Sequence, residues 1–240
     1  MNVAIITSIY YPQNSKSKYD LITKVLNNIP DYAGVDYTLF VMNDGVEDSR
    51  IDSFLKEYKP RNFCKKIVVT SRENRGITAS LNELLDQVDS SYDYICLLDL
   101  DIFVPVYWLK KCISVLNNFS QVGVCGVLVE DYLNFNTSLG IGETKDNVLF
   151  CNVPSIGGAC LVFRSEELKA YRWDETLVSD HIDAYILTRY ITDKKNICAI
   201  LDRGFHPRDE YESEEFVKMK RERFERELPV FYDTINKLKR

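Results

Sequence analysis

The sequence lacks the basic and the long hydrophobic stretches that place proteins on nucleic acids or in membranes. Its 30 Lys and Arg residues against 36 Asp and Glu residues give a net charge of −6. Nucleic-acid-binding surfaces are usually basic, so we expect no nucleic-acid partner. No apolar run approaches the roughly 18 residues of a membrane span, and the amino terminus has neither the basic region nor the cleavage site of a signal peptide. We expect a soluble, cytoplasmic protein.

Histidines and paired cysteines are also scarce. The two histidines exclude a metal site built from a histidine cluster. None of the seven cysteines forms a C-x-x-C pair, and most lie inside apolar segments. An odd number of scattered cysteines is typical of buried, reduced thiols in an intracellular protein.

Apolar segments that alternate with amphipathic ones predict an α/β fold. We expect strands over residues 3–9, 37–42, 66–70, 94–98, 121–130, 155–163 and 197–201. We expect the main helices over residues 19–29, 51–58, 79–88 and 106–117. Such alternation implies a parallel sheet with right-handed crossovers, and the sheet is open because the chain is short for a barrel.

Local signals mark the ends of two helices and the division of the chain. Pro30 is expected just beyond the first helix, and Asp48 or Ser49 is expected to cap the second. Residues 1–208 are predicted to form one domain, and residues 209–240 a C-terminal helical segment packed on it. The same amphipathic segment also fits contact with an anionic membrane or with a second copy.

In the segment Tyr94–Asp101, an apolar run that reads as a buried strand is followed by two carboxylates, Asp99 and Asp101. Side chains at positions i and i+2 of a strand share a face, and ligands of open α/β sheets bind at the carboxyl ends of strands. Two such carboxylates repel each other unless a cation lies between them. Oxygen ligands favour Mg²⁺ or Mn²⁺, which would hold a diphosphate. Alternatively, one Asp caps the next segment and the other is solvated.

Several further motifs follow one another in a fixed order. They are Ile6–Tyr10, Val41–Val46, Asn74-Arg75-Gly76 with Asn82, Asp99-Leu100-Asp101, Gly157-Gly158 followed by Phe163-Arg164, and Asp180–Asp183. In this order, roughly residues 3–206 resemble the GT-A nucleotide-sugar-dependent glycosyltransferases, most closely the family 2 members. Asn43 stands where that family has the first Asp of its V-D-D-G-S turn.

The resemblance implies a GT-A fold, which is a Rossmann-like, mostly parallel open sheet flanked by helices, here with a C-terminal helical appendage. It implies a metal-dependent, inverting glycosyltransferase that uses a nucleotide-diphosphate sugar, with a UDP-sugar favoured. The cofactor would be Mn²⁺ or Mg²⁺. The acceptor would be a hydroxyl group, in glycan or polysaccharide biosynthesis, and many relatives act on lipid-linked acceptors. Peripheral membrane contact through the C-terminal helix is therefore an expectation to test.

The resemblance also assigns the metal ligands. Asp101 would contact the metal directly, and Asp99 would contact the metal or the ribose. His206 would be a third ligand, because the family often places one after its last strand, and imidazole suits Mn²⁺. A histidine of a surface loop is the alternative for His206.

The nucleotide-binding residues follow in the same way. Asp44 would accept the N3–H of a uracil or an equivalent base, although an Asp-Gly pair is also a common turn. Thr7 or Ser8 could bond the base from the first strand. Arg75 could pair with the diphosphate, whose geometry a guanidinium matches.

An inverting transfer needs a base that takes the proton of the acceptor hydroxyl. Here the region of the family's E-D motif is Asp180-His181-Ile182-Asp183. We prefer Asp180 as the base and Asp183 second, and His181 is a further candidate. Asp180 also fits a helix N-cap.

Two other functions remain open. A nucleotidyltransferase that forms nucleotide-sugars would carry a glycine-rich loop after its first strand, and residues 10–14 contain no glycine. A non-catalytic relative that binds a nucleotide or a glycan would explain the altered E-D motif.

Overall fold

The computed structural model describes residues 1–11, 16–129, 141–153, 156–170, 172–173, 175 and 195–207. The predicted base residues Asp180, His181 and Asp183 lie outside the described residues, as does the predicted C-terminal segment 209–240. None of the helices in the described ranges is both long enough and apolar enough to span a membrane.

One nine-stranded sheet runs through the described part of the chain, in the order β3-β2-β1-β4-β8-β5-β9-β7-β6. Its strands are β1 (Val3–Ile9), β2 (Tyr37–Asp44), β3 (Cys64–Arg72), β4 (Tyr94–Leu98), β5 (Val122–Val129), β6 (Ile141–Glu143), β7 (Leu149–Asn152), β8 (Cys160–Arg164) and β9 (Asn196–Gly204). In this sheet β7 and β8 run in the direction opposite to the other seven strands. The predicted mostly parallel open sheet is therefore confirmed.

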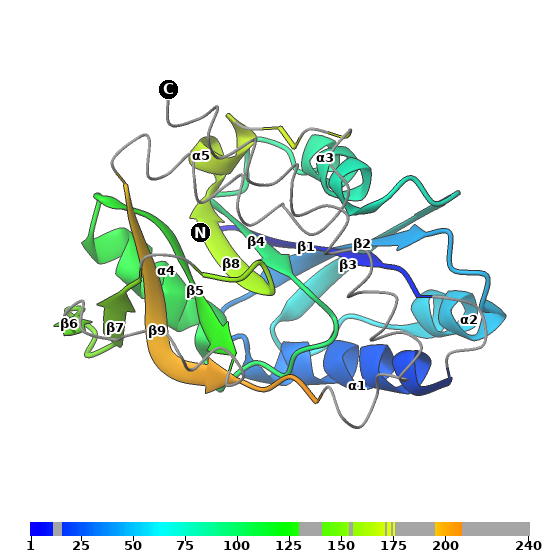
Figure 1. Cartoon of the computed structure of the whole chain (residues 1–240), viewed down its shortest axis with the longest axis horizontal. Helices are drawn as coiled ribbons and strands as arrows, with labels where there is room; N and C mark the ends of the chain where they lie inside the picture. Colours follow the sequence, from blue (N-terminus) through cyan, green and yellow to red (C-terminus); the bar gives the residue numbers. More distant parts are fainter. Residues whose placement is uncertain are drawn as a thin grey trace, which may run out of the picture.

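Helices cover both faces of this sheet. On one face lie α1 (Lys16–Tyr32), α2 (Ser49–Glu57) and α4 (Trp108–Asn118), and on the other lie α3 (Ile77–Gln87) and α5 (Ser165–Lys169). Figure 1 shows α1 and α2 below the sheet and α3 and α5 above it. Strand alternation divides the core accordingly, since Ile5 and Ile9 join the α1 face whereas Ala4 and Ile6 join the α3 face.

Pro30 lies inside helix α1, and the prediction that it follows the helix is wrong. Proline has no N–H to donate to the carbonyl four residues earlier, which is that of Leu26. The hydroxyl of Tyr58 donates to this carbonyl instead. A tertiary hydrogen bond thus replaces the missing helical one and lets the helix continue to Tyr32.

Other element ends differ from the predictions by a few residues. Strand β3 continues to Arg72, two residues beyond the predicted end, and β8 begins only at Cys160. Asp48 caps α2 as predicted, because its side chain accepts a hydrogen bond from the backbone N of Arg50.

Candidate active site

The predicted nucleotide and metal residues of the described part gather at one edge of the sheet. The parallel strands β1, β2, β4 and β9 all end at this edge. Asp44 is the last residue of β2, Asp99 follows β4, and His206 follows β9. Topology therefore brings together residues that lie far apart in the sequence.

Asp101 and His206 are in direct contact at this edge. The Nε2 atom of His206 lies 3.2 Å from Oδ2 of Asp101, and the two side chains are 8% and 28% exposed. Strand β4 ends at Leu98 and a turn includes Asp101. Strand alternation therefore does not set the direction of the Asp101 side chain, and its position follows from the contact with His206.

A two-residue bridge explains why His206 meets Asp101. The backbone N of Phe103 donates to the carbonyl of Phe205 over 2.8 Å, and the N of Phe205 donates to the carbonyl of Phe103 over 2.9 Å. This antiparallel bridge ties the chain beyond β4 to the chain beyond β9. The residues next to it, on both sides, are thereby placed side by side.

The pair suits a divalent cation. A carboxylate oxygen and an imidazole nitrogen are both ligands of Mn²⁺, and neighbouring ligands about 2.1 Å from an octahedral ion lie about 3 Å apart. The other nitrogen of His206, Nδ1, is buried and has no hydrogen-bond partner within the described ranges. Asp99 is exposed, and its backbone N donates to the carbonyl of Ala159 over 2.8 Å. In the part of the chain that the structure describes, no cluster of three acidic, histidine or cysteine side chains could hold a metal.

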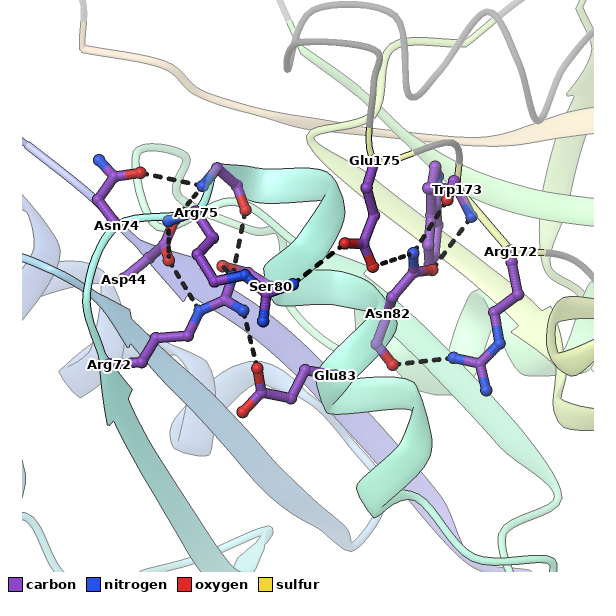
Figure 2. A network of polar contacts seen from close by, with 11 residues as sticks. Asp44, Arg72, Asn74, Arg75, Ser80, Asn82, Glu83, Arg172, Trp173 and Glu175 are labelled. Carbon is purple, nitrogen blue, oxygen red and sulfur yellow. Dashed lines mark hydrogen bonds and ion pairs between the residues drawn. The ribbon is translucent and has the colours of Figure 1, made fainter.

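Asp44 is buried where β2 meets the start of α3, as Figure 2 shows. Its Oδ1 accepts hydrogen bonds from the backbone N of Arg75 (3.1 Å) and from Nε of Arg72 (3.0 Å). Its Oδ2 accepts one from the backbone N of Gly76 (3.0 Å). The carboxylate is thus oriented by the N-terminal end of a helix, where negative charge is favourable.

Gly45 allows this approach. Its φ of +78° is unfavourable for other residues, and a Cβ atom there would lie 2.5 Å from the backbone N of Asn74. The side chain of Asn74 in turn accepts a hydrogen bond from the N of Gly76 over 2.9 Å. The Asp-Gly turn and the Asn-Arg-Gly loop therefore pack against each other directly.

Asn43 shows why the departure from the family's first Asp is tolerated. Its Oδ1 accepts a hydrogen bond from the N of Val46 (3.0 Å), and its Nδ2 donates to Oδ1 of Asp52 on α2 (2.8 Å). An ionised Asp could accept the first bond but could not make the second. Asn43 therefore closes the turn and anchors α2, on the sheet face opposite Asp44.

Arg72 belongs to the site and was missed by the sequence analysis. It is the register partner of Asp44. Its guanidinium also donates to Oε2 of Glu83 (2.8 Å) and to Oγ of Ser80 (2.9 Å) on α3. The strand was predicted to end at Thr70, two residues before Arg72. Opposite charges at the ends of neighbouring strands were the signal that could have identified it.

The two first-strand candidates, Thr7 and Ser8, point to different faces. Ser8 pairs with Met42, which packs on the α3 face that Asp44 also shares. Thr7 pairs with Val41 on the α1 face, and its buried hydroxyl has no partner in the described ranges. The structure therefore brings Ser8, rather than Thr7, to the face of Asp44.

The side chain of Arg75 is 58% exposed and pairs with Glu175, whose Oε2 lies 3.2 Å from Nη2 of Arg75. Glu175 also contacts the buried Asn82 of α3, and Figure 2 shows these three side chains in a row. Glu175 was not predicted, because no local pattern marks a residue that follows α5 as a neighbour of the loop before α3.

Solved structures with a similar fold are glycosyltransferases at low sequence identity. Residues 1–349 of TarS from S. aureus give a TM-score of 0.63 at 16% identity, covering 86% of this chain and 60% of that one. GalNAc-T7, solved with UDP, GalNAc and Mn²⁺, gives 0.61 at 9% identity, covering 85% and 43%. The mannosyltransferase PcManGT from Pyrobaculum calidifontis, solved with GDP-Man and Mn²⁺, gives 0.57 at 15% identity, covering 82% and 56%.

The present chain thus spans about 60% of the TarS fragment and less of the two other chains. These likenesses confirm the expected GT-A fold. A comparison with curated proteins finds no significant match. The family model described as "Glycosyl transferase family 2" matches residues 14–172, which is more than half of the chain. The chain therefore belongs to glycosyl transferase family 2.

Proposed function

We propose that this protein transfers a sugar from a nucleotide-diphosphate donor, with a UDP-sugar favoured, to an acceptor hydroxyl with inversion, in the synthesis of a glycan. Family membership supports glycosyl transfer. The donor class is supported by the neighbours, since the TarS fragment was also solved with UDP-GlcNAc and PcManGT with GDP-Man.

The contact between Asp101 and His206 carries the proposal of metal dependence. An acidic oxygen and an imidazole nitrogen lie 3.2 Å apart at the carboxyl edge of the central strands, where ligands of open α/β sheets bind. In our proposal they hold Mn²⁺ or Mg²⁺, and Asp99, from the same turn, contacts the metal or the ribose. A bound divalent cation would act as a Lewis acid on the departing diphosphate.

The nucleotide would lie between this pair and Asp44. The Asp44 carboxylate accepts three hydrogen bonds from described residues, and a carboxylate has about four acceptor positions. In our proposal the remaining position accepts the N3–H of a uracil, with Ser8 on the same face. Arg72 holds the carboxylate in place, and Arg75 supplies a cation for the diphosphate.

The proposed base lies in the segment Asp180–Asp183. We keep Asp180 as the base, with Asp183 and His181 as the alternatives, because an inverting transfer needs a proton acceptor beside the acceptor hydroxyl. Glu175 precedes them by a few residues and lies beside Arg75. Separate Asp180→Asn, His181→Gln and Asp183→Asn variants would identify the base as the residue whose loss removes turnover and leaves donor binding intact.

The direct test is the binding of UDP and GDP, each with and without Mn²⁺. Binding is measured by calorimetry and by the shift of the midpoint of thermal unfolding. A ligand that binds only the folded state raises the midpoint by mass action. We expect one nucleotide to raise it with Mn²⁺ only, and Asp101→Asn and His206→Gln to abolish the metal effect. Asp202→Asn is the matched control, because Asp202 lies on β9, the strand that precedes His206, and pairs with Lys111 of α4. This variant should leave binding unchanged.

Absence of binding by either nucleotide, with any divalent cation, would contradict the proposal. Retention of metal-dependent binding by both variants would remove the metal assignment alone. The anomeric configuration of the product, followed by NMR during the reaction, tests inversion.

We also propose a cytoplasmic location, with residues 209–240 in contact with the membrane surface. Co-sedimentation with vesicles that contain anionic lipid, compared with neutral vesicles, tests the membrane contact. Equal recovery of the protein with both kinds of vesicle would argue against electrostatic attachment.

A further inference from the structure

The residues after α5 run back along helix α3, in the opposite direction. Arg172 pairs with Asp86 near the end of α3 and donates to the carbonyl of Asn82 over 2.9 Å. Trp173 contacts the side chain of Asn82, and Glu175 reaches Arg75 just before the start of α3. Residues 172, 173 and 175, here called the return segment, therefore lie along α3 and reach the loop that precedes it (Figure 2).

The amide of Asn82 anchors this segment and has only one consistent orientation. The backbone N of Trp173 is a donor, so the atom that faces it, at 3.1 Å, must be Oδ1. The Nδ2 atom then donates to the carbonyl of Trp173 (2.9 Å) and to Oε1 of Glu175 (3.1 Å). Asn82 is buried, and this arrangement uses both of its N–H groups.

The two carboxylate oxygens of Glu175 bind different partners. Its Oε1 accepts the hydrogen bond from Asn82, and its Oε2 accepts one from Nη2 of Arg75 over 3.2 Å. The backbone N of Arg75 donates to Asp44. Arg75 is therefore held at its backbone by Asp44 and at its guanidinium by Glu175.

Among the described residues, Glu175 alone contacts the guanidinium of Arg75, and the other donors can serve a second anion. Arginine has five N–H donors, and the contact with Glu175 is made through Nη2. A phosphate can bind to the remaining donors while Glu175 keeps its own bond. The side chains of Arg75 and Glu175 are 58% and 46% exposed, so their ion pair adds little to stability. The main effect of this ion pair is therefore to fix the direction of the Arg75 side chain.

We propose that Glu175 is a positioning residue that orients Arg75 toward the diphosphate of the donor, with Asn82 as its anchor. This inference rests on the proposed function, because it needs a nucleoside diphosphate in the site. In this role Glu175 acts through its contact with Arg75 and has no direct part in the chemistry. Its effect on donor binding must therefore pass through Arg75, which a double-mutant cycle can measure.

The test is calorimetry of UDP and of UMP, with Mn²⁺, on the full chain and on Arg75→Gln, Glu175→Gln and the double variant. Loss of a charge-assisted hydrogen bond predicts about tenfold weaker UDP binding for Arg75→Gln. We expect about threefold weaker binding for Glu175→Gln and no further loss when this change is added to Arg75→Gln. UMP has no second phosphate, so its affinity should change less than about twofold in all three variants. GDP serves as the second diphosphate probe.

Arg172→Gln is the matched control on the same segment. It removes an exposed ion pair with Asp86 and a hydrogen bond to the backbone carbonyl of Asn82, and it leaves Glu175 and the side-chain amide of Asn82 in place. It should bind UDP like the unmodified chain. If Glu175→Gln still weakens UDP binding in the Arg75→Gln background, or if it tightens binding, the positioning role is wrong. If the unmodified chain binds neither UDP nor GDP, the proposed function fails first and takes this inference with it.

Discussion

Asp44 and Arg72 are register partners on neighbouring parallel strands, and Nε of Arg72 donates to Oδ1 of Asp44 over 3.0 Å. Their side chains are 2% and 11% exposed. A charge pair so shielded from water stabilises the fold only while both partners are present, because an unpaired buried charge is costly. This pair therefore links the candidate nucleotide site to the stability of the sheet.

We expect Arg72→Met to lower the free energy of unfolding by about 3 kcal/mol, because it leaves the buried Asp44 without its cation. Urea denaturation measures the loss. Lys65→Met is the control on the same strand, since Lys65 forms an exposed pair with Asp36 and should cost less than about 0.5 kcal/mol. Equal losses in the two variants would show that the pair is no more important than a surface contact.

The bridge between Phe103 and Phe205 predicts that metal binding depends on a backbone hydrogen bond. Phe205→Pro removes the N–H that donates to Phe103, which should move His206 away from Asp101 and weaken Mn²⁺ binding about tenfold. Calorimetry of Mn²⁺ binding in the presence of UDP measures this. Phe205→Ala keeps the N–H and removes only a half-exposed ring, so its Mn²⁺ affinity should be unchanged; a proline variant that behaves like the alanine variant would show the bridge to be dispensable.

Asp48 predicts an acid-dependent loss of stability. Its pKa is lowered from 3.8 to about 2, chiefly by hydrogen bonds from the guanidinium of Arg50, with smaller contributions from the backbone N of Arg50 and the hydroxyl of Tyr11. A depressed folded-state pKa contributes stability that is complete above the unfolded value and is lost as the pH falls toward 2. The difference in unfolding free energy between the unmodified chain and Asp48→Asn should therefore be constant from pH 7 to pH 5 and shrink below pH 4. Urea titrations across this range measure it, and a difference that does not vary with pH would exclude the linkage.

The cysteines predict slow reaction with thiol reagents. All seven are unpaired and buried, and burial raises the pKa of several of their thiols, including that of Cys198 to about 12. The thiolate is the reactive form of cysteine. We therefore expect at most about one of the seven thiols to react rapidly with Ellman's reagent at pH 8 in the folded protein, and all seven to react after unfolding in urea. Fast reaction of several thiols in the folded protein would contradict the buried arrangement.

Much of the fold could be predicted from the sequence because hydrophobic periodicity reports burial directly. The buried strands 3–9 and 94–98 have the predicted ends, since both are mostly apolar segments that bury both of their faces. Ends set by tertiary contacts could not be predicted. Helix α1 continues past Pro30, and Tyr58, from beyond α2, satisfies the carbonyl of Leu26.

Some residues of the candidate site could be predicted from the sequence, and others could not. Asp101 was predicted because two carboxylates end a buried strand, and the role of Asp44 was assigned by the family resemblance. Arg72 and Glu175 were missed because their importance comes from partners distant in sequence, namely Asp44 for the first and Asn82 for the second. The pairing of Asp101 with His206 was suggested by the family resemblance, and its physical cause, the Phe103–Phe205 bridge, has no local sequence signal.

That bridge also bears on the order in which the protein folds. Strands β1 to β4 form one contiguous parallel block of the sheet from the first part of the chain, whereas the bridge closes a loop that extends from Phe103 to Phe205. Loop closure over such a separation is entropically costly, and contacts of this kind tend to form late. In refolding, or on the ribosome, the nucleotide side around Asp44 would assemble before the Asp101–His206 pair. The contact between Asp101 and His206 would thus form only after β9 has joined the sheet.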